Sequence, residues 1–153
     1  MKQYRWIVPL IILAAACGPS LVSQSEFITA FVATNPSEYE RLRFADEASD
    51  EYELLNAEVA DDSLYLSVSY DGGCTEVSFT LWLNEIMQSD TSSLPTLASV
   101  LVLEDTDTCE IAIRNEIPFA LSDLPTGPYT LFVHSGSTPG QVLAVDVPSV
   151  SSE

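Results

Sequence analysis

Apolar and polar residues alternate along two neighbouring segments in the middle of the chain. Across residues 63–70, leucine, leucine, valine and tyrosine occupy every second position. This is the period-2 pattern of a half-buried strand. The alternation resumes across residues 77–83, where valine, phenylalanine and two leucines recur in the same way. Both segments are therefore predicted to be β-strands with one apolar face.

The dipeptide Asp71-Gly72 stands just after the first of these strands. Such a dipeptide is typical of a two-residue hairpin turn. That turn would set Leu66 opposite Val77 and bring the apolar residues of both strands onto one face. We therefore expect the two strands to pair with each other as an antiparallel hairpin.

Five more segments have strand-like patterns, and turn residues at 61–62, 124–128 and 135–140 separate several of them. No long helix is predicted that could make parallel crossovers, so the pattern favours an all-β fold, an antiparallel β-sandwich. The segments are 54–59, 99–104, 110–121 with a break near residue 115, 129–134 and 141–147.

Residues 124–129 read Leu-Pro-Thr-Gly-Pro-Tyr. They resemble the tyrosine corner of immunoglobulin-like domains, in which a tyrosine near the start of a late strand bonds back across the corner loop. The resemblance implies this role for Tyr129 and favours an immunoglobulin-like topology. The alternative is a tyrosine packed at a sheet edge.

The segment before the predicted strands has a different character. Asn35 suits a helix cap, Pro36 suits the first helical position and Glu38 can reach back to the cap, which predicts a short helix over residues 36–44. An acidic stretch across residues 45–51 follows, without apolar periodicity. We therefore expect an anchor or linker segment over residues 17–50 and the β-sandwich domain over residues 51–153.

The chain begins with Lys2, Arg5 and an apolar run over residues 6–16 that ends in three alanines. This is the layout of a secretory signal peptide. A membrane-spanning helix needs roughly 20 apolar residues, so the run is too short to be a permanent span. Residues 1–16 are therefore predicted to be a cleaved signal peptide.

Residues 13–18 read Leu-Ala-Ala-Ala-Cys-Gly and resemble the lipobox of bacterial lipoproteins. The resemblance implies that Cys17 is lipidated and anchors the protein in the membrane of the bacterial cell envelope. Ala14 stands where the family prefers leucine, so an ordinary signal peptidase that leaves Cys17 as a free thiol is the alternative. Gly18 in place of the aspartate that marks inner-membrane retention in some bacteria favours the outer membrane.

Charge excludes one large class of partner. Among 153 residues, 5 Lys and Arg face 23 Asp and Glu, a formal charge of −18. Removal of the signal peptide takes away Lys2 and Arg5 and leaves three arginines, which gives −20. A phosphate backbone would be repelled, so nucleic acid is not expected as a partner.

The three cysteines have two different expected roles. If Cys17 carries the lipid, Cys74 and Cys109 remain, and an exported protein in an oxidising compartment is expected to join them in a disulfide. The alternative is two separate buried thiols. With one histidine in the chain and no Cys-x-x-Cys spacing, a zinc site is not indicated.

Three segments at 70–79, 107–109 and 119–124 resemble small uncharacterised bacterial lipoproteins. The family pattern is Tyr-x-Gly-Gly-Cys-x-x-His-x-Phe, then Asp-x-Cys, then Phe-x-Leu-x-x-Leu. Here the segments read Tyr-Asp-Gly-Gly-Cys-Thr-Glu-Val-Ser-Phe, Asp-Thr-Cys and Phe-Ala-Leu-Ser-Asp-Leu. Val77 replaces the family histidine, so no role of that histidine carries over. The resemblance implies a disulfide-pinned β domain and no particular activity.

Two features could carry chemistry. His134, the single histidine, could be the base of a small secreted hydrolase, but no Gly-x-Ser-x-Gly elbow accompanies it. Asp105, Asp107 and the acidic loop at residues 46–51 could help to bind calcium, although the spacing around the two aspartates is not that of an EF-hand.

We therefore expect a non-catalytic, cofactor-free envelope lipoprotein, a structural or binding module whose partner is an unidentified envelope protein. An acidic calcium-binding domain and a small hydrolase are the alternatives.

Overall fold

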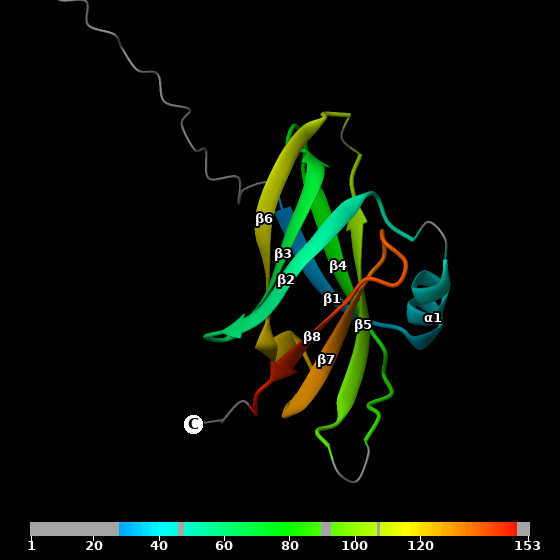
Figure 1. Ribbon diagram of the computed structural model, residues 1–153, viewed down its shortest axis with the longest axis vertical. Helices are drawn as coiled ribbons and strands as arrows, with labels where there is room; N and C mark the ends of the chain where they lie inside the picture. The colour runs from blue at the N-terminus through cyan, green and yellow to red at the C-terminus, as the bar shows by residue number, and fades with distance from the viewer. Residues whose placement is uncertain (1–27, 46–47, 90–92, 107, 150–153) are drawn as a thin grey trace, which may run out of the picture.

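The computed structural model describes residues 28–45, 48–89, 93–106 and 108–149. These residues form mostly β-strands, which confirms the all-β fold class (Figure 1). The strands are β1 (Ile28–Thr34), β2 (Tyr52–Ala60), β3 (Ser63–Gly72), β4 (Val77–Leu83), β5 (Thr96–Glu104), β6 (Ile111–Ala120), β7 (Tyr129–Ser135) and β8 (Val142–Val147). The helix α1 spans Pro36–Phe44, and a short 3-10 helix spans Leu121–Asp123.

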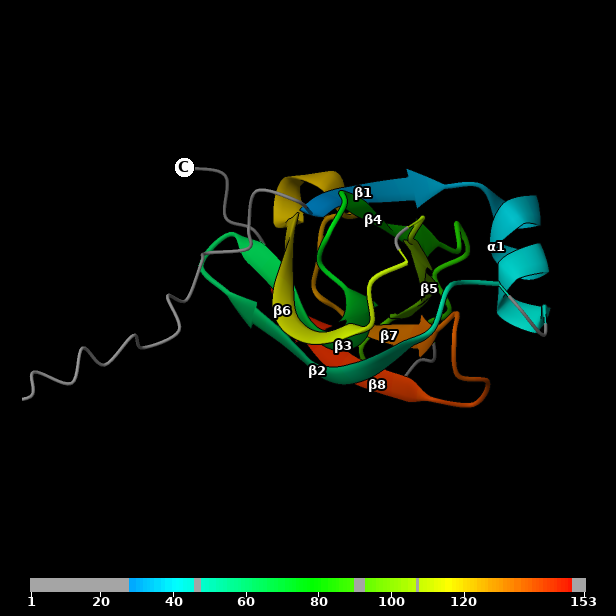
Figure 2. The same cartoon turned by 90° about the horizontal axis from the view of Figure 1, so that it is seen from above.

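The strands form two sheets with the order β1-β4-β5-β7-β8 in one and β2-β3-β6 in the other (Figure 2). One hydrophobic cluster takes side chains from both sheets. Its fully buried members include Leu66 and Ile117 from the smaller sheet and Phe79, Leu101 and Leu131 from the larger one. Burial of these side chains is the main force that holds the sheets together.

The apolar faces of β3 and β4 are those predicted from the alternation, but the predicted hairpin between them is wrong. β3 pairs with β2 and β6, whereas β4 pairs with β1 and β5. The rings of Tyr70 and Phe79 instead meet across the core, with centroids 5.6 Å apart. Alternation shows which side of a strand is buried, but not whether its partner lies beside it or across the core. Gly73, at a φ of 99°, lies in the loop that carries the chain from one sheet to the other.

The expectation of purely antiparallel pairing is also wrong. β1 pairs with β4 and β5 pairs with β7 in parallel. In an immunoglobulin constant domain the three-stranded sheet contains the third, sixth and seventh strands, whereas here it contains the second, third and sixth. The strand order is therefore not that of the predicted immunoglobulin-like topology. The chain changes sheets between β5 and β6 and again between β6 and β7, which side-chain alternation does not reveal.

Residues 28–44, which we expected in the linker, add an edge strand, β1, to the larger sheet and a helix, α1, that packs against it. β1 pairs with β4 from Ile28 opposite Val77 to Thr34 opposite Leu83. Its sequence, Ile-Thr-Ala-Phe-Val-Ala-Thr, is apolar on both faces and so lacks a clear alternation. The structure thus extends the β domain toward the N-terminus, past the boundary expected at residue 51.

The helix predicted over residues 36–44 is confirmed as α1. The Asn35 side chain caps it by accepting a hydrogen bond from the Glu38 amide at 3.2 Å. Tyr39 and Leu42 are buried against β5, so α1 covers part of the outer face of the larger sheet.

The remaining predicted strands are present with shifted ends. They correspond to β2, β5, β6, β7 and β8. No break occurs near Asn115, because β6 is continuous there and Asn115 pairs with Val68 of β3.

The predicted disulfide between Cys74 and Cys109 is confirmed, with the two Cα atoms 6.1 Å apart. It joins the loop between β3 and β4 to the loop between β5 and β6. Each of these loops carries the chain from one sheet to the other. The disulfide therefore links two of the loops through which the chain passes from one sheet to the other.

Candidate functional site

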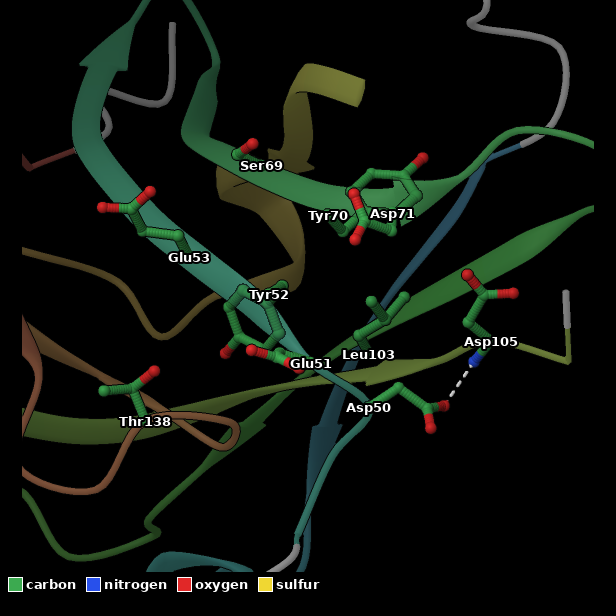
Figure 3. A pocket seen from close by; sticks show the side chains of 10 residues that line it. All are labelled: Asp50, Glu51, Tyr52, Glu53, Ser69, Tyr70, Asp71, Leu103, Asp105 and Thr138. Carbon is green, nitrogen blue, oxygen red and sulfur yellow. Dashed lines mark hydrogen bonds between the residues drawn. The ribbon is translucent and has the colours of Figure 1, made fainter. Parts of the chain in front are cut away.

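A groove with a volume of about 430 Å³ lies beside the ends of β3 and β5, and we call it the acidic groove (Figure 3). Five of its lining residues are carboxylates and none is basic. Such a surface attracts positively charged groups and repels anions. The lining residues are Asp50, Glu51, Tyr52, Glu53, Ser69, Tyr70, Asp71, Leu103, Asp105 and Thr138.

Hydrogen bonds at the end of β5 bring the Asp50 side chain to the backbone of Asp105. Ser49 Oγ accepts a hydrogen bond from the Leu103 amide at 2.8 Å, and the Asp50 amide donates to the Leu103 carbonyl at 3.0 Å. The Asp50 carboxylate then accepts a hydrogen bond from the Asp105 amide at 2.6 Å (Figure 3). The loop before β2 and the loop after β5 therefore meet where the Asp50 carboxylate contacts the Asp105 amide.

Tyr52 lies at the inner end of the groove and connects three segments. Its hydroxyl donates a hydrogen bond to the Leu101 carbonyl at 2.6 Å and accepts one from the Gly136 amide at 3.1 Å. Its own amide donates to Ser137 Oγ at 3.0 Å. Burial raises the pKa of Tyr52 to about 12, although hydrogen bonds from Ser135 and Gly136 oppose the shift. No local sequence motif indicates that Tyr52 connects these three segments.

Gln141 is a second residue whose role the sequence did not indicate. Its side-chain amide donates to the Leu54 carbonyl at 2.7 Å and accepts from the Leu54 amide at 3.4 Å. These two hydrogen bonds resemble the backbone hydrogen bonds that a neighbouring strand would make with Leu54. They join β2 of the smaller sheet to the residue that precedes β8 of the larger sheet.

Tyr129 does not form the predicted tyrosine corner. Its side chain is fully buried, and its hydroxyl has no hydrogen-bond partner among the described residues. Burial raises the pKa of Tyr129 to about 12. Tyr129 therefore makes no bond across its corner loop, whereas the buried hydroxyl of Tyr52 joins distant segments of the chain.

Replacement of these two tyrosines by phenylalanine is expected to have opposite effects. Tyr52→Phe removes hydrogen bonds of a buried hydroxyl and should lower the free energy of unfolding by about 1–2 kcal/mol. Tyr129→Phe removes a buried hydroxyl without a partner and should leave the stability unchanged or raise it by about 1 kcal/mol. Urea unfolding of both variants and the parent measures the difference. A Tyr129→Phe protein as destabilised as Tyr52→Phe would show that the Tyr129 hydroxyl has a partner.

The raised tyrosine pKa values also predict a pH dependence. Tyr52 and Tyr129 keep their protons in the folded protein up to about pH 12, whereas the ordinary tyrosine pKa is 10.0. As the pH rises above 10, the unfolded chain loses these protons first, so the free energy of unfolding should fall. Urea unfolding below pH 10 and at about pH 11 tests this. In the Tyr52→Phe, Tyr129→Phe double variant the fall should be smaller, and an equal fall would contradict the assignment.

The structure gives His134 no catalytic partner among the described residues. It lies on β7 opposite Val100 of β5 and Val142 of β8, and its side chain is half-buried. Burial lowers the pKa of His134, and the positive charge of Arg43 lowers it further. Within the part of the chain that is described, no serine or carboxylate is hydrogen-bonded to it, so the arrangement that a hydrolase triad needs is not formed there.

The predicted calcium ligands are only partly placed. Asp105 lies in the acidic groove, whereas Asp107 falls outside the described residues. Over ranges 28–45, 48–89, 93–106 and 108–149, no group of three or more His, Cys, Asp or Glu side chains is arranged to hold a metal ion.

The predicted lipidation site, Cys17, and the predicted signal peptide also lie outside the described residues. Within the described ranges, no helix has the length and apolar character needed to cross a membrane.

Comparison with known proteins identifies a similar fold. No family model matches the chain, and no curated protein matches it. Among solved structures, the chain is similar to a protein of unknown function, DUF1344, from Bacteroides vulgatus ATCC 8482, with a TM-score of 0.50 and 12% sequence identity. The similarity covers 79% of this chain and 57% of that chain, so this chain spans little more than half of the other's length. At this identity the likeness concerns the fold alone.

Proposed function

We propose that this chain is a non-catalytic binding module of the bacterial cell envelope, built as a β-sandwich and held at the outer membrane by a lipid on Cys17. A cluster of buried side chains that the two sheets share supports the sandwich arrangement. The lipobox-like sequence at residues 13–18 supports the anchor.

The acidic groove is the main support for the proposed binding role. It gathers Asp50, Glu51, Glu53, Asp71 and Asp105 around one opening. Disulfide-linked loops flank it, since Asp71 precedes Cys74 and Asp105 precedes Cys109. A surface of this charge favours a partner that presents positive groups.

The anchor is tested by the intact mass of the protein extracted with detergent from its own host. We expect a chain that begins at an acylated Cys17, with two thiols that become reactive only after reduction. A Cys17→Ser variant is the control and should carry no lipid. An unacylated wild-type chain would contradict the anchor and make the protein a soluble secreted one.

Calcium binding is a second candidate function, supported by the acidic lining of the groove, which includes Asp50 and Asp105. A ligand that binds only the folded state raises its stability. If calcium is the ligand, the melting temperature in calcium should exceed that in a chelator, and an Asp50→Asn, Asp105→Asn double variant should lose the difference. Equal melting temperatures for the wild type would exclude calcium.

A further inference from the structure

The two sheets end in four edge strands, and three of them carry features that oppose pairing with another chain. Proteins protect the unpaired backbone groups of an edge with charged side chains, proline, irregular pairing or a covering segment. In the smaller sheet, β2 carries two glutamates and shifts its register after Leu54, and β6 carries an arginine, a glutamate and Pro118. In the larger sheet, β8 carries Asp146, and Gln141 just before it is hydrogen-bonded to Leu54 of β2.

The fourth edge strand, β1, has none of these features. Its sequence contains no charged residue and no proline, and its register with β4 is continuous from Ile28 to Thr34. β4 pairs with only one side of β1, at the border of the larger sheet (Figure 2). β6 comes near the other side, but in the part of the chain that the structure describes the β1 backbone is hydrogen-bonded only to β4. The outer edge of β1 can therefore accept an extended strand.

The sequence of β1 is complementary to itself when two copies run antiparallel. A two-fold symmetric interface places the same segment of each copy opposite the other. With Phe31 at the centre, Phe31 faces its own counterpart, Ala30 faces Val32 and Thr29 faces Ala33. Ala30 and Val32 both pack on the core, so this register keeps the core faces of the two sheets on the same side. Phe31 is 54% exposed on the other face, where a cross-strand pair of aromatic rings stabilises the contact.

Charge opposes the approach of two copies but not the pairing of β1 itself. The chain has a formal charge of −18, so two copies repel each other at a distance. None of this charge lies on β1, and salt at 0.1 M screens the repulsion beyond about 10 Å. Pairing through β1 should therefore become stronger as the ionic strength rises. Binding of a basic partner would become weaker instead.

We propose that this chain forms a two-fold symmetric dimer, in which the free edge of β1 pairs antiparallel with β1 of a second copy around Phe31. The dimer joins two 5-stranded sheets into one continuous sheet. One strand from each copy makes a small interface, so the dimer is weak and exchanges with the monomer. The proposal depends neither on the lipid anchor nor on the acidic groove.

Sedimentation equilibrium of the chain that carries Cys17→Ser tests the dimer, because this substitution removes the third thiol. We expect a reversible monomer–dimer equilibrium that shifts toward the dimer as salt is added. Phe31→Lys should weaken the dimer by about tenfold or more, since it sets like charges opposite each other. Ile111→Lys is the matched control and should leave the dimer unchanged, because Ile111 is 59% exposed on the edge strand β6. Both substitutions change the net charge equally, and the melting temperature of each variant checks its fold.

Disulfide trapping tests the register and does not depend on the Phe31→Lys variant. In the proposed dimer the two copies of residue 31 have Cα atoms about 5 Å apart, which is within the range of a disulfide. The two copies of residue 29 are offset by about 13 Å along the strands. In the Cys17→Ser chain, mild oxidation should therefore link Phe31→Cys into a covalent dimer, whereas Thr29→Cys should stay monomeric.

Three results would overturn the proposal. The first is a parent chain that stays monomeric at all salt concentrations up to about 1 mM protein, which would leave the edge of β1 to a strand of another protein. The second is a dimer that Phe31→Lys and Ile111→Lys weaken equally or not at all. The third is equal disulfide trapping at positions 29 and 31.

Discussion

Replacement of Phe79 by alanine is expected to lower the free energy of unfolding by about 3–5 kcal/mol. Phe79 is fully buried on β4, and its ring meets those of Tyr52 and Tyr70 edge to face, with centroids 6.0 and 5.6 Å apart. Both tyrosines belong to the opposite sheet. The variant therefore loses buried apolar area and leaves a cavity where the two sheets meet.

Urea unfolding followed by circular dichroism measures the effect. Phe44→Ala is the matched control, because Phe44 is 74% exposed at the end of α1. We expect the control to change stability by no more than about 0.5 kcal/mol. Similar losses in the two variants would show that Phe79 does not occupy a closely packed position.

The burial of Phe79 was predictable from sequence, whereas its contacts were not. The alternation from Val77 to Leu83 predicts the buried face of β4, and the structure confirms it. The neighbours of Phe79 depend on which sheet each strand joins. Pairing β4 with β3 and placing β4 across the core from β3 both bury the same side chains, so the hydrophobic pattern does not distinguish them. Which of the two arrangements forms depends on the path of the loop between β3 and β4.

The edge strand β1 was not predicted for a related reason. One face of β1 packs on the core through Ile28, Ala30 and Val32, while Phe31 on the other face is also apolar. A strand with two apolar faces has no period-2 signal. Its place in the sheet follows from parallel pairing with β4, which is a contact between distant parts of the chain.

The candidate site was predictable only in its composition. Asp50 belongs to an acidic stretch and Asp105 to a second one, 55 residues further along the chain. The sequence shows that both segments are acidic. Their adjacency depends on hydrogen bonds between residues 49–50 and the end of β5. No local sequence motif indicates these hydrogen bonds. Tyr52 was missed for the same reason, since its partners Leu101 and Gly136 come from remote segments.

Removal of the disulfide is the second change with a large expected effect. Cys74 and Cys109 are 35 residues apart, and closing a loop of this size restricts the unfolded chain by about 4 kcal/mol on the chain-entropy model. A Cys74→Ala, Cys109→Ala double variant should lose about this much free energy of unfolding. For a domain whose total stability is about 5–15 kcal/mol, the loss is severe.

The experiment compares urea unfolding of two chains that both carry Cys17→Ser, one with the disulfide and one with the double alanine substitution. The shared substitution removes the third thiol, so the disulfide is the only difference in cysteine chemistry. Adding a reducing agent should destabilise the first chain toward the second and leave the second unchanged. The entropic effect of a disulfide arises in the unfolded chain. A loss of free energy of unfolding below about 1 kcal/mol would therefore mean that the two loops are already restricted in the unfolded chain without the disulfide.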